Sequence, residues 1–150
     1  MGSDREEIID VLVRYATAID TRDWPLFRTC FIDDITADYG DIGSWQGIDE
    51  FTTFMITAHA GMGRTQHFLS NFVIDVEGHR AASVAYVHAV TVLASNPDDW
   101  IDTVGTHEDE IIHGADGWRI AKRTFQTTRT IFSPSLSDGS HSSNGPEVAT

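Results

Sequence analysis

The hydrophobic residues of this chain change their spacing between its first and second halves. From Glu6 to Ile19 they recur at three- and four-residue steps, which predicts an amphipathic helix. From Thr65 onward, long segments rich in Val, Ile, Thr and aromatic residues are separated by turn residues, which indicates strands. Helices followed by consecutive hairpins predict an α+β domain, in which a curved, mainly antiparallel sheet wraps over the N-terminal helices.

Local signals place the individual elements. Ser3 or Asp4 is expected to cap the first helix, and Asp23 precedes Trp24-Pro25 at the start of a short second helix that runs to about Cys30. A short strand at 35–39, a turn-rich crossing at 40–47 and a third helix at 48–60 follow. The antiparallel meander is then expected at Thr65 to Val76, Ala81 to Leu93, Trp100 to His113 and Gly117 to Phe132.

Length and composition predict one domain. The chain has 150 residues, of which 41% are hydrophobic, and we expect a single domain over residues 1–133. Polar residues dominate from Ser133 onward, so residues 134–150 are expected to form a flexible tail. No apolar run is long enough to span a bilayer, and the N-terminus lacks the order of a signal peptide. We therefore expect a cytoplasmic protein without a membrane partner.

Charge and motif content exclude several classes of function. Ten Lys and Arg residues against 23 Asp and Glu give a formal net charge of −13, which would repel nucleic acid. The single cysteine, Cys30, allows no internal disulfide and is expected to be buried. No HExxH, P-loop, GxGxxG or GxSxG motif occurs, so no metal or cofactor is expected. The Arg-rich, Lys-poor balance is a bias that occurs in some high-GC bacteria.

Asp20 and His67 are the first candidates for chemistry. Asp20 lies where the first helix ends, next to the negative end of the helix dipole, so a positive or donating group is expected nearby. His67 lies in an alternating strand segment. A carboxylate can fix the tautomer of an imidazole and raise its basicity, which would give a general base. The alternatives are that Asp20 only bridges its own turn in solvent and that His67 is a hydrogen-bonded structural residue.

Three further residues could contribute to such a site. Tyr15 precedes Asp20 by five residues, so both reach one pocket only if it lies over the flank and end of the helix. His88 shares a strand face with Val84, Tyr86 and Val90 and is expected in apolar surroundings or a cavity. Arg123 could bind an anion or pair with Asp20, or be part of a solvated basic strand end.

The order of these motifs resembles the SnoaL-like branch of the nuclear transport factor 2-like superfamily, a group of cone-shaped α+β barrels that includes scytalone dehydratase. The resemblance covers about residues 5–133. It rests on a run from Tyr15 to Trp24, on Thr36-Ala37-Asp38-Tyr39, on Arg64-Thr65-Gln66-His67-Phe68 and on the late segment from Gly117 to Arg123.

The resemblance implies a catalytic role for Asp20 and His67. In scytalone dehydratase the residues at these places belong to the catalytic site, and a tyrosine at the place of Tyr39 assists through water. Bile-acid 7α-dehydratase is similar at Tyr15, and hexachlorocyclohexane dehydrochlorinase at Arg123. The chain departs from scytalone dehydratase at Ile19, where that enzyme has tyrosine, so the identity of the substrate does not transfer.

We therefore expect a cofactor-independent, dehydratase-like lyase acting on a small apolar polyketide, steroid or alicyclic substrate. The alternatives are an isomerase or cyclase with the same base, and a non-catalytic domain for ligand binding or assembly. A homodimer or homotrimer is expected, because large apolar sheet faces rarely stay in water. The expected catalytic residues are Asp20, His67, Tyr15, Tyr39 and Arg123, and the expected substrate-binding residues are Trp24, Phe27, Met55, Phe68, His88 and Asn71.

Overall fold

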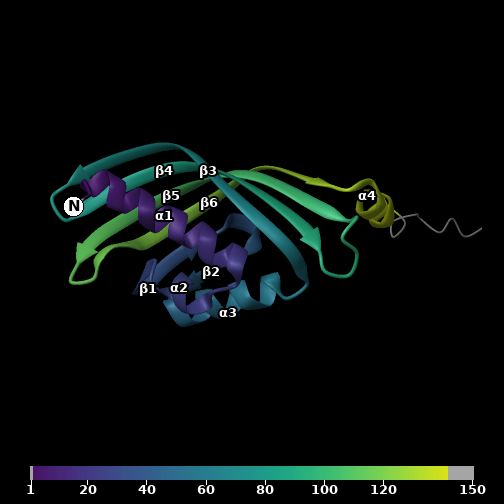
Figure 1. Cartoon of the computed structure of the whole chain (residues 1–150), viewed down its shortest axis with the longest axis horizontal. Coiled ribbons are helices and arrows are strands. Elements are labelled where there is room, and N and C mark those ends of the chain that lie inside the picture. Colours follow the sequence, from purple (N-terminus) through teal and green to yellow (C-terminus); the bar gives the residue numbers. More distant parts are fainter. Residues whose placement is uncertain (1, 142–150) are drawn as a thin grey trace, which may run out of the picture.

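A six-stranded open sheet curves around a layer of three helices (Figure 1). The structure is a computed structural model that describes residues 2–141. The strand order is β2-β1-β6-β5-β4-β3. This arrangement confirms the predicted α+β cone, in which N-terminal helices pack into a curved, mainly antiparallel sheet.

The first two helices begin where the capping signals predict. Helix α1 (Asp4–Thr21) starts with a capping box, in which the Ser3 hydroxyl accepts from the Glu6 backbone and the Glu6 carboxylate accepts from the Ser3 backbone. Helix α2 (Trp24–Arg28) starts at Asp23, whose carboxylate accepts a hydrogen bond from Leu26 N. Helix α3 (Ile48–His59) follows the crossing and buries Phe51 and Met55.

The long strands form the predicted meander. They are β3 (Met62–Glu77), β4 (Arg80–Leu93), β5 (Trp100–Gly114) and β6 (Gly117–Phe132), and each pairs with the next in antiparallel register. Strand β1 (Phe31–Asp38) pairs with β6 in parallel and with the short β2 (Ser44–Gln46) in antiparallel register. A 3-10 turn η1 (Gly40–Ile42) precedes β2, so the crossing carries more order than its sequence predicts.

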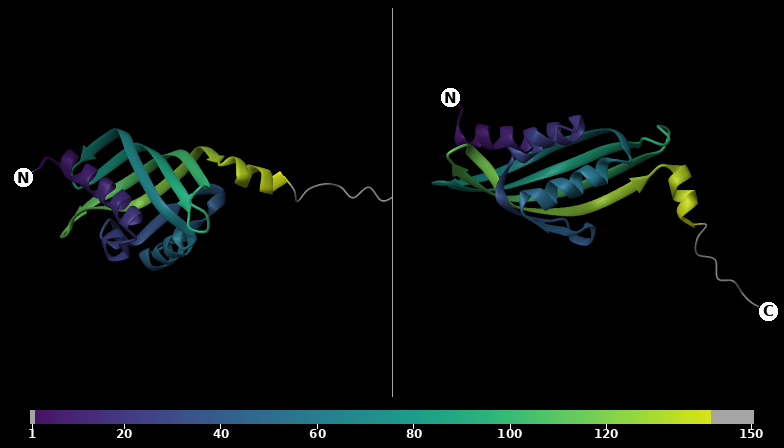
Figure 2. Two further views of the ribbon diagram at one scale, coloured as in Figure 1. Left: turned by 45° about the vertical axis from the view of Figure 1, so that its right-hand side comes forward. Right: turned by 90° about the horizontal axis from the view of Figure 1, so that it is seen from below.

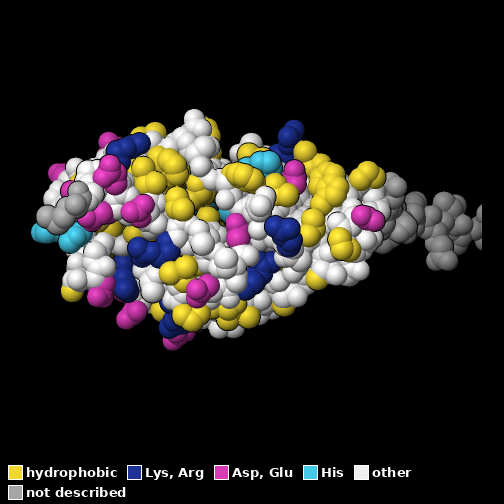
Figure 3. Space-filling view, in the orientation of Figure 1, with side chains coloured by type: hydrophobic (Ala, Val, Ile, Leu, Met, Phe, Trp, Pro, Cys, Tyr) yellow, Lys and Arg dark blue, Asp and Glu magenta, His cyan; other side chains and the backbone are white. Residues whose placement is uncertain are grey.

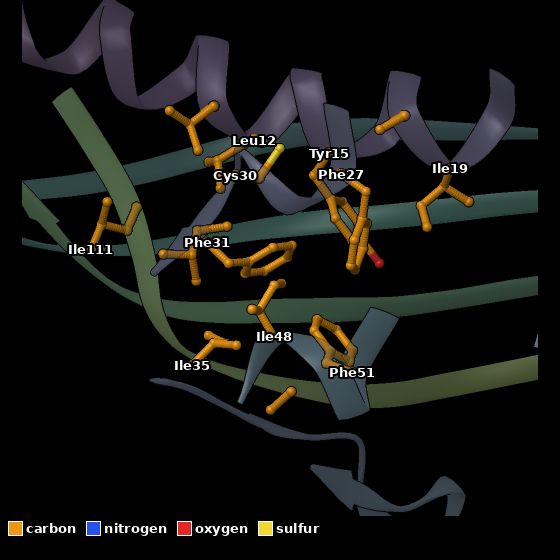
Figure 4. Close-up of a cluster of buried hydrophobic side chains, with 14 of the residues drawn as sticks. Leu12, Tyr15, Ile19, Phe27, Cys30, Phe31, Ile35, Ile48, Phe51 and Ile111 are labelled. Atoms are coloured by element: carbon orange, nitrogen blue, oxygen red, sulfur yellow. The ribbon is translucent and has the colours of Figure 1, made fainter. Parts of the chain in front are cut away.

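Aromatic side chains join the helices to the sheet (Figure 4). Phe27, Phe31 and Phe51 are fully buried, with ring centroids 4.9 to 5.3 Å apart. Rings at this separation add edge and offset attraction to the burial of apolar surface. Cys30 lies in the same core, as predicted, and burial raises the pKa of its thiol to about 11.

Part of the segment expected as a tail is helical. Residues Pro134–His141 form helix α4, at the opposite end of the molecule from the start of α1 (Figure 2). Proline is favoured in a first helical turn, and the hydroxyls of Ser133 and Ser135 both donate to the Asp99 carboxylate. The rest of the expected tail lies outside the described residues. Across residues 2–141, no helix has the length and apolar character needed to cross a membrane.

A close approach between β5 and β6 requires glycine at position 105, and Gly105→Ala should destabilise the fold. A Cβ there would lie 2.6 Å from the Gln126 carbonyl oxygen and 2.6 Å from the Phe125 ring. We expect a loss of about 1–3 kcal/mol in the free energy of unfolding, measured by urea denaturation. Gly114→Ala is the control, because a Cβ at Gly114 meets no atom within 4 Å. Equal stability of the two variants would contradict this account.

Candidate active site

The end of α1 is tied to strand β3 by one carboxylate. Asp20 Oδ1 lies 2.7 Å from His67 Nδ1 and accepts from the Thr65 hydroxyl at 2.9 Å. Asp20 Oδ2 accepts from the His67 backbone N–H at 2.9 Å. These are the donors that a carboxylate at the negative end of a helix needs. Asp20 therefore bonds to β3 rather than to its own turn.

The hydrogen bonds fix how His67 presents its ring. Burial alone would raise the pKa of Asp20, but bonds from the His67 ring, the His67 backbone and Thr65 lower it below its ordinary value. Asp20 is thus a carboxylate at neutral pH and can only accept, so Nδ1 of His67 carries the proton. The imidazole is 13% exposed and lines a cavity. Its Nε2 is therefore the nitrogen that can accept a proton from an occupant.

Arg22 supports the Asp20–His67 pair from the end of α1. Its backbone is left-handed (φ 56°), and its guanidinium donates to the Ile19 carbonyl, the Thr65 hydroxyl and the Gly63 carbonyl at 2.6 to 2.8 Å. The Thr65 hydroxyl can therefore direct its own proton only to Asp20. This chain of donors orients the carboxylate before any ligand arrives.

The cavity beside His67 has a volume of about 210 Å³. Its inner end is formed by buried side chains, Tyr15, Tyr39 and Phe125, while Ile42 is exposed where the cavity meets solvent. The structure therefore brings four of the predicted site residues together around one space: Tyr15, Tyr39, Met55 and His67. The remaining lining residues are Phe54, Ala58, His59, Met62, Val87, Ala89, Thr91, Thr103 and His107.

Two tyrosine hydroxyls meet at the inner end. The oxygens of Tyr15 and Tyr39 are 3.1 Å apart and share a hydrogen bond. Burial raises the pKa of both phenols above the ordinary value, and Arg123 only partly offsets this. Both hydroxyls are therefore protonated at neutral pH. One of them can donate to an oxygen in the cavity while the other supports it.

Arg123 pairs with Asp109, not with Asp20 as one reading of the sequence has it. Both side chains are buried, and Nε and Nη2 of Arg123 donate to the Asp109 carboxylate at 2.8 and 2.7 Å. Burial alone would lower the pKa of Arg123, but Asp109 raises it well above the ordinary value. The guanidinium also lies 4.2 Å from the centre of the Tyr15 ring. Arg123 therefore packs against the Tyr15 ring and does not line the cavity.

The other predicted binding residues lie outside the cavity. Phe27 is in the core, and Trp24 packs on Phe27 and His59 at its edge. Phe68 and His88 are neighbours on the outer face of the sheet, where Phe68 is 54% exposed and His88 faces Asp102 at 3.5 Å. The homodimer or homotrimer that we expect through an apolar sheet face would use the outer face around Phe68 and His88. It stays a prediction.

A β-bulge accounts for the position of Asn71. The register of β3 against β4 shifts between Ser70 and Val73, and Asn71 adopts a left-handed conformation (φ 55°). A bulge adds one residue to a strand and so exchanges the two faces beyond it. Asn71 is exposed, and Val73, expected on the same face as His67, points outward.

Two histidines that the sequence reading left out line the cavity. His107 alternates with Gly105 and Asp109 on the inner face of β5, and this alternation is the signal that could have identified it. His59 ends α3, and its Nδ1 lies 2.8 Å from the Met55 carbonyl. Burial lowers the pKa of His59, although the Met55 carbonyl opposes the shift. Its Nε2 is left as an acceptor.

Figure 3 shows acidic side chains gathered toward the end of the molecule that carries the start of α1. Within residues 2–141, no group of three or more His, Cys, Asp or Glu side chains is arranged to hold a metal ion. The buried charges beside the cavity are already paired, Asp109 with Arg123.

Comparisons with known proteins agree with this fold. The sequence profile of the SnoaL-like domain matches residues 2–124. An uncharacterized protein of Mycobacterium tuberculosis is 29% identical over 122 residues, which cover 81% of this chain and 83% of that protein. A candidate aromatic ring hydroxylase of Novosphingobium aromaticivorans is 27% identical, with a TM-score of 0.78 over 87% of this chain and 92% of its own.

Two more distant solved structures share the fold. A candidate scytalone dehydratase of Novosphingobium aromaticivorans has a TM-score of 0.78 at 20% identity and covers 85% of each chain. A hexachlorocyclohexane dehydrochlorinase of Novosphingobium barchaimii has a TM-score of 0.76 at 15% identity, over 87% of this chain and 90% of its own.

Removing only Asp109 from the buried Asp109–Arg123 pair should destabilise the fold more than replacing both residues. Asp109→Ala leaves the Arg123 charge buried without a counter-charge, and we expect a loss of about 3–5 kcal/mol in the free energy of unfolding. The double variant Asp109→Ala, Arg123→Met should recover much of that loss, because no buried charge remains. Urea denaturation of the three proteins measures both effects, and a double variant no more stable than the single one would refute the explanation.

The lowered pKa of Asp20 should appear as acid-dependent stability. A carboxyl whose pKa is lower in the folded than in the unfolded protein contributes stability above its unfolded pKa, about 4, and loses it as the pH falls through the folded pKa. The stability advantage of the wild type over Asp20→Asn should therefore be larger at pH 5 than at pH 3, measured by urea denaturation. An equal advantage at both values would show that Asp20 gains nothing from its donors.

Proposed function

Since the chain belongs to the SnoaL-like domain family, we propose that it is a cofactor-independent lyase that catalyses a dehydratase-like elimination on a small, largely apolar substrate. The observation that carries the proposal is the 2.7 Å contact between Asp20 and His67 at the wall of a cavity. The carboxylate orients the imidazole and stabilises its charged form, which is the arrangement of a general base.

The proposed reaction moves one proton at each side of the substrate. His67 Nε2 takes a proton from the carbon next to the one that holds the leaving oxygen. The electron pair of that C–H bond forms the new double bond as the C–O bond breaks. Tyr15 or Tyr39 donates a proton to the departing oxygen, which leaves as water, and the proton held by His67 then passes through solvent to the tyrosine phenolate. Arg123 lies against Tyr15, and its charge favours the phenolate that forms briefly.

The names of the structural neighbours support this choice. The candidate scytalone dehydratase and the dehydrochlorinase are named for eliminations. Two of the neighbours have names that refer to rings, hexachlorocyclohexane and an aromatic ring. A cavity of about 210 Å³ favours the alicyclic end of the expected substrate range over a steroid, because pockets for drug-sized ligands have volumes of roughly 300–1,000 Å³.

His67→Gln should reduce turnover of any substrate found by screening. General-base catalysis contributes about 10²- to 10⁴-fold to a rate, so we expect kcat to fall by that factor, and Asp20→Asn to lower it by at least about tenfold. The control is His88→Gln, which changes a histidine on the outer face of the sheet. Full activity in both Asp20→Asn and His67→Gln would refute the mechanism.

Product mass separates the proposed reaction from its alternatives. An elimination lowers the mass of the substrate by one water or one HX, whereas an isomerase or cyclase with the same base leaves it unchanged. Binding of the screened compounds with no turnover would instead favour the ligand-binding domain.

A further inference from the structure

His107 is a buried histidine for which the described residues provide no hydrogen-bond partner. It lies on β5, is only 3% exposed and lines the cavity. Its ring makes edge contacts with Tyr15 at 5.6 Å and Phe125 at 5.4 Å between centroids. These contacts fix the plane of the imidazole but satisfy neither of its nitrogens.

The electrostatic surroundings keep this imidazole neutral. Burial lowers the pKa of His107 well below the ordinary value, and the charges of Arg123 and His67 act in the same direction. A neutral imidazole has one N–H donor and one acceptor nitrogen. Buried polar groups are almost always hydrogen-bonded, because leaving them without a partner is costly. His107 therefore requires a partner from whatever occupies the cavity.

The position of His107 in the sheet separates it from His67. His67 pairs with Ala89 of β4, whereas His107 pairs with Ala85, four residues further along the same strand. Ala85 precedes Ala89 on β4, so His107 lies toward the inner end, beside Tyr15. An oxygen held there would leave the rest of the molecule extending toward His67.

The size and charge of the cavity limit that molecule. Cavities of about 150 Å³ hold benzene, and a volume of about 210 Å³ leaves room for one ring with small substituents. Asp109 already neutralises Arg123, so no unpaired buried cation is available for an acid group. A neutral ligand is therefore favoured over an anion.

We propose that His107 is a substrate-binding residue that accepts or donates a hydrogen bond to a neutral oxygen, a hydroxyl or a carbonyl, on a substrate with a single six-membered ring. That the bound molecule is a substrate rests on the proposed function. The binding preference itself requires no turnover. His107 thereby selects oxygenated rings over hydrocarbon rings of the same shape.

Two matched pairs of probes test this preference. Phenol and toluene have the same number of heavy atoms and differ only in a hydroxyl that replaces a methyl group, as do cyclohexanol and methylcyclohexane. Affinities are measured by NMR titration of the full chain. We expect the ratio of phenol affinity to toluene affinity to fall about tenfold in His107→Phe, because the hydroxyl then lacks its partner. The cyclohexanol pair should change in the same direction, and His107→Gln should retain part of the preference.

Phe125→Leu is the control for cavity shape. Phe125 lines the same space and packs on His107, so its variant should alter both affinities and leave their ratio unchanged. An unchanged ratio in a folded His107→Phe variant, or benzoate binding more tightly than phenol, would overturn the proposal. Folding is checked by circular dichroism and the unfolding midpoint.

A measurement on the wild type does not depend on any variant. In side-chain ¹H–¹⁵N spectra, phenol should shift the ring nitrogens of His107 more than toluene does, and equal shifts would overturn the proposal. None of these probes needs to react. A failed elimination assay would therefore leave the result for His107 standing, and a failed binding test would leave the role of His67 open to its own assay.

Discussion

The bonds from Asp20 to strand β3 hold the site together. A carboxylate at the end of α1 would be unfavourable by itself, because it meets the negative end of the helix dipole. It is stabilised by three donors from Thr65 and His67 on the facing strand. The same bonds dock the helix on the sheet and set the His67 tautomer. Stability and proposed catalysis thus depend on one group.

A second buried interaction supports the opposite side of the cavity. Arg123 and Asp109 lie directly across β5 and β6 from each other and neutralise one another. The guanidinium lies over the Tyr15 ring, and the Tyr15 hydroxyl shares a hydrogen bond with the Tyr39 hydroxyl. The cavity therefore has a proton acceptor on one wall and protonated donors at its inner end. Mostly apolar side chains line the space between, where polar interactions act more strongly than in water.

The sequence predicts the elements well and the side-chain directions only in part. Helix caps and strand periods are local, so α1 and the meander follow from nearby residues. The residue types and their places on the helix end and the strand suggest the pairing of Asp20 with His67, and the family resemblance strengthens it. Asn71 faces outward because of the bulge in β3, whereas Phe68 faces outward because it is the strand neighbour of the inward-facing His67. The partner of Arg123 depends on the register of β5 against β6, which shifts twice along its length, and no local pattern encodes that register.

The central claim is that Asp20 holds His67 with its Nε2 unprotonated and available to the cavity. Side-chain ¹⁵N NMR of the wild type near pH 8 measures this directly, because protonated and unprotonated ring nitrogens have different shifts. The account predicts a protonated Nδ1 and an unprotonated Nε2 in His67, and a mixture of both tautomers in Asp20→Ala. A proton on Nε2 in the wild type, or the same tautomer in both proteins, would contradict it.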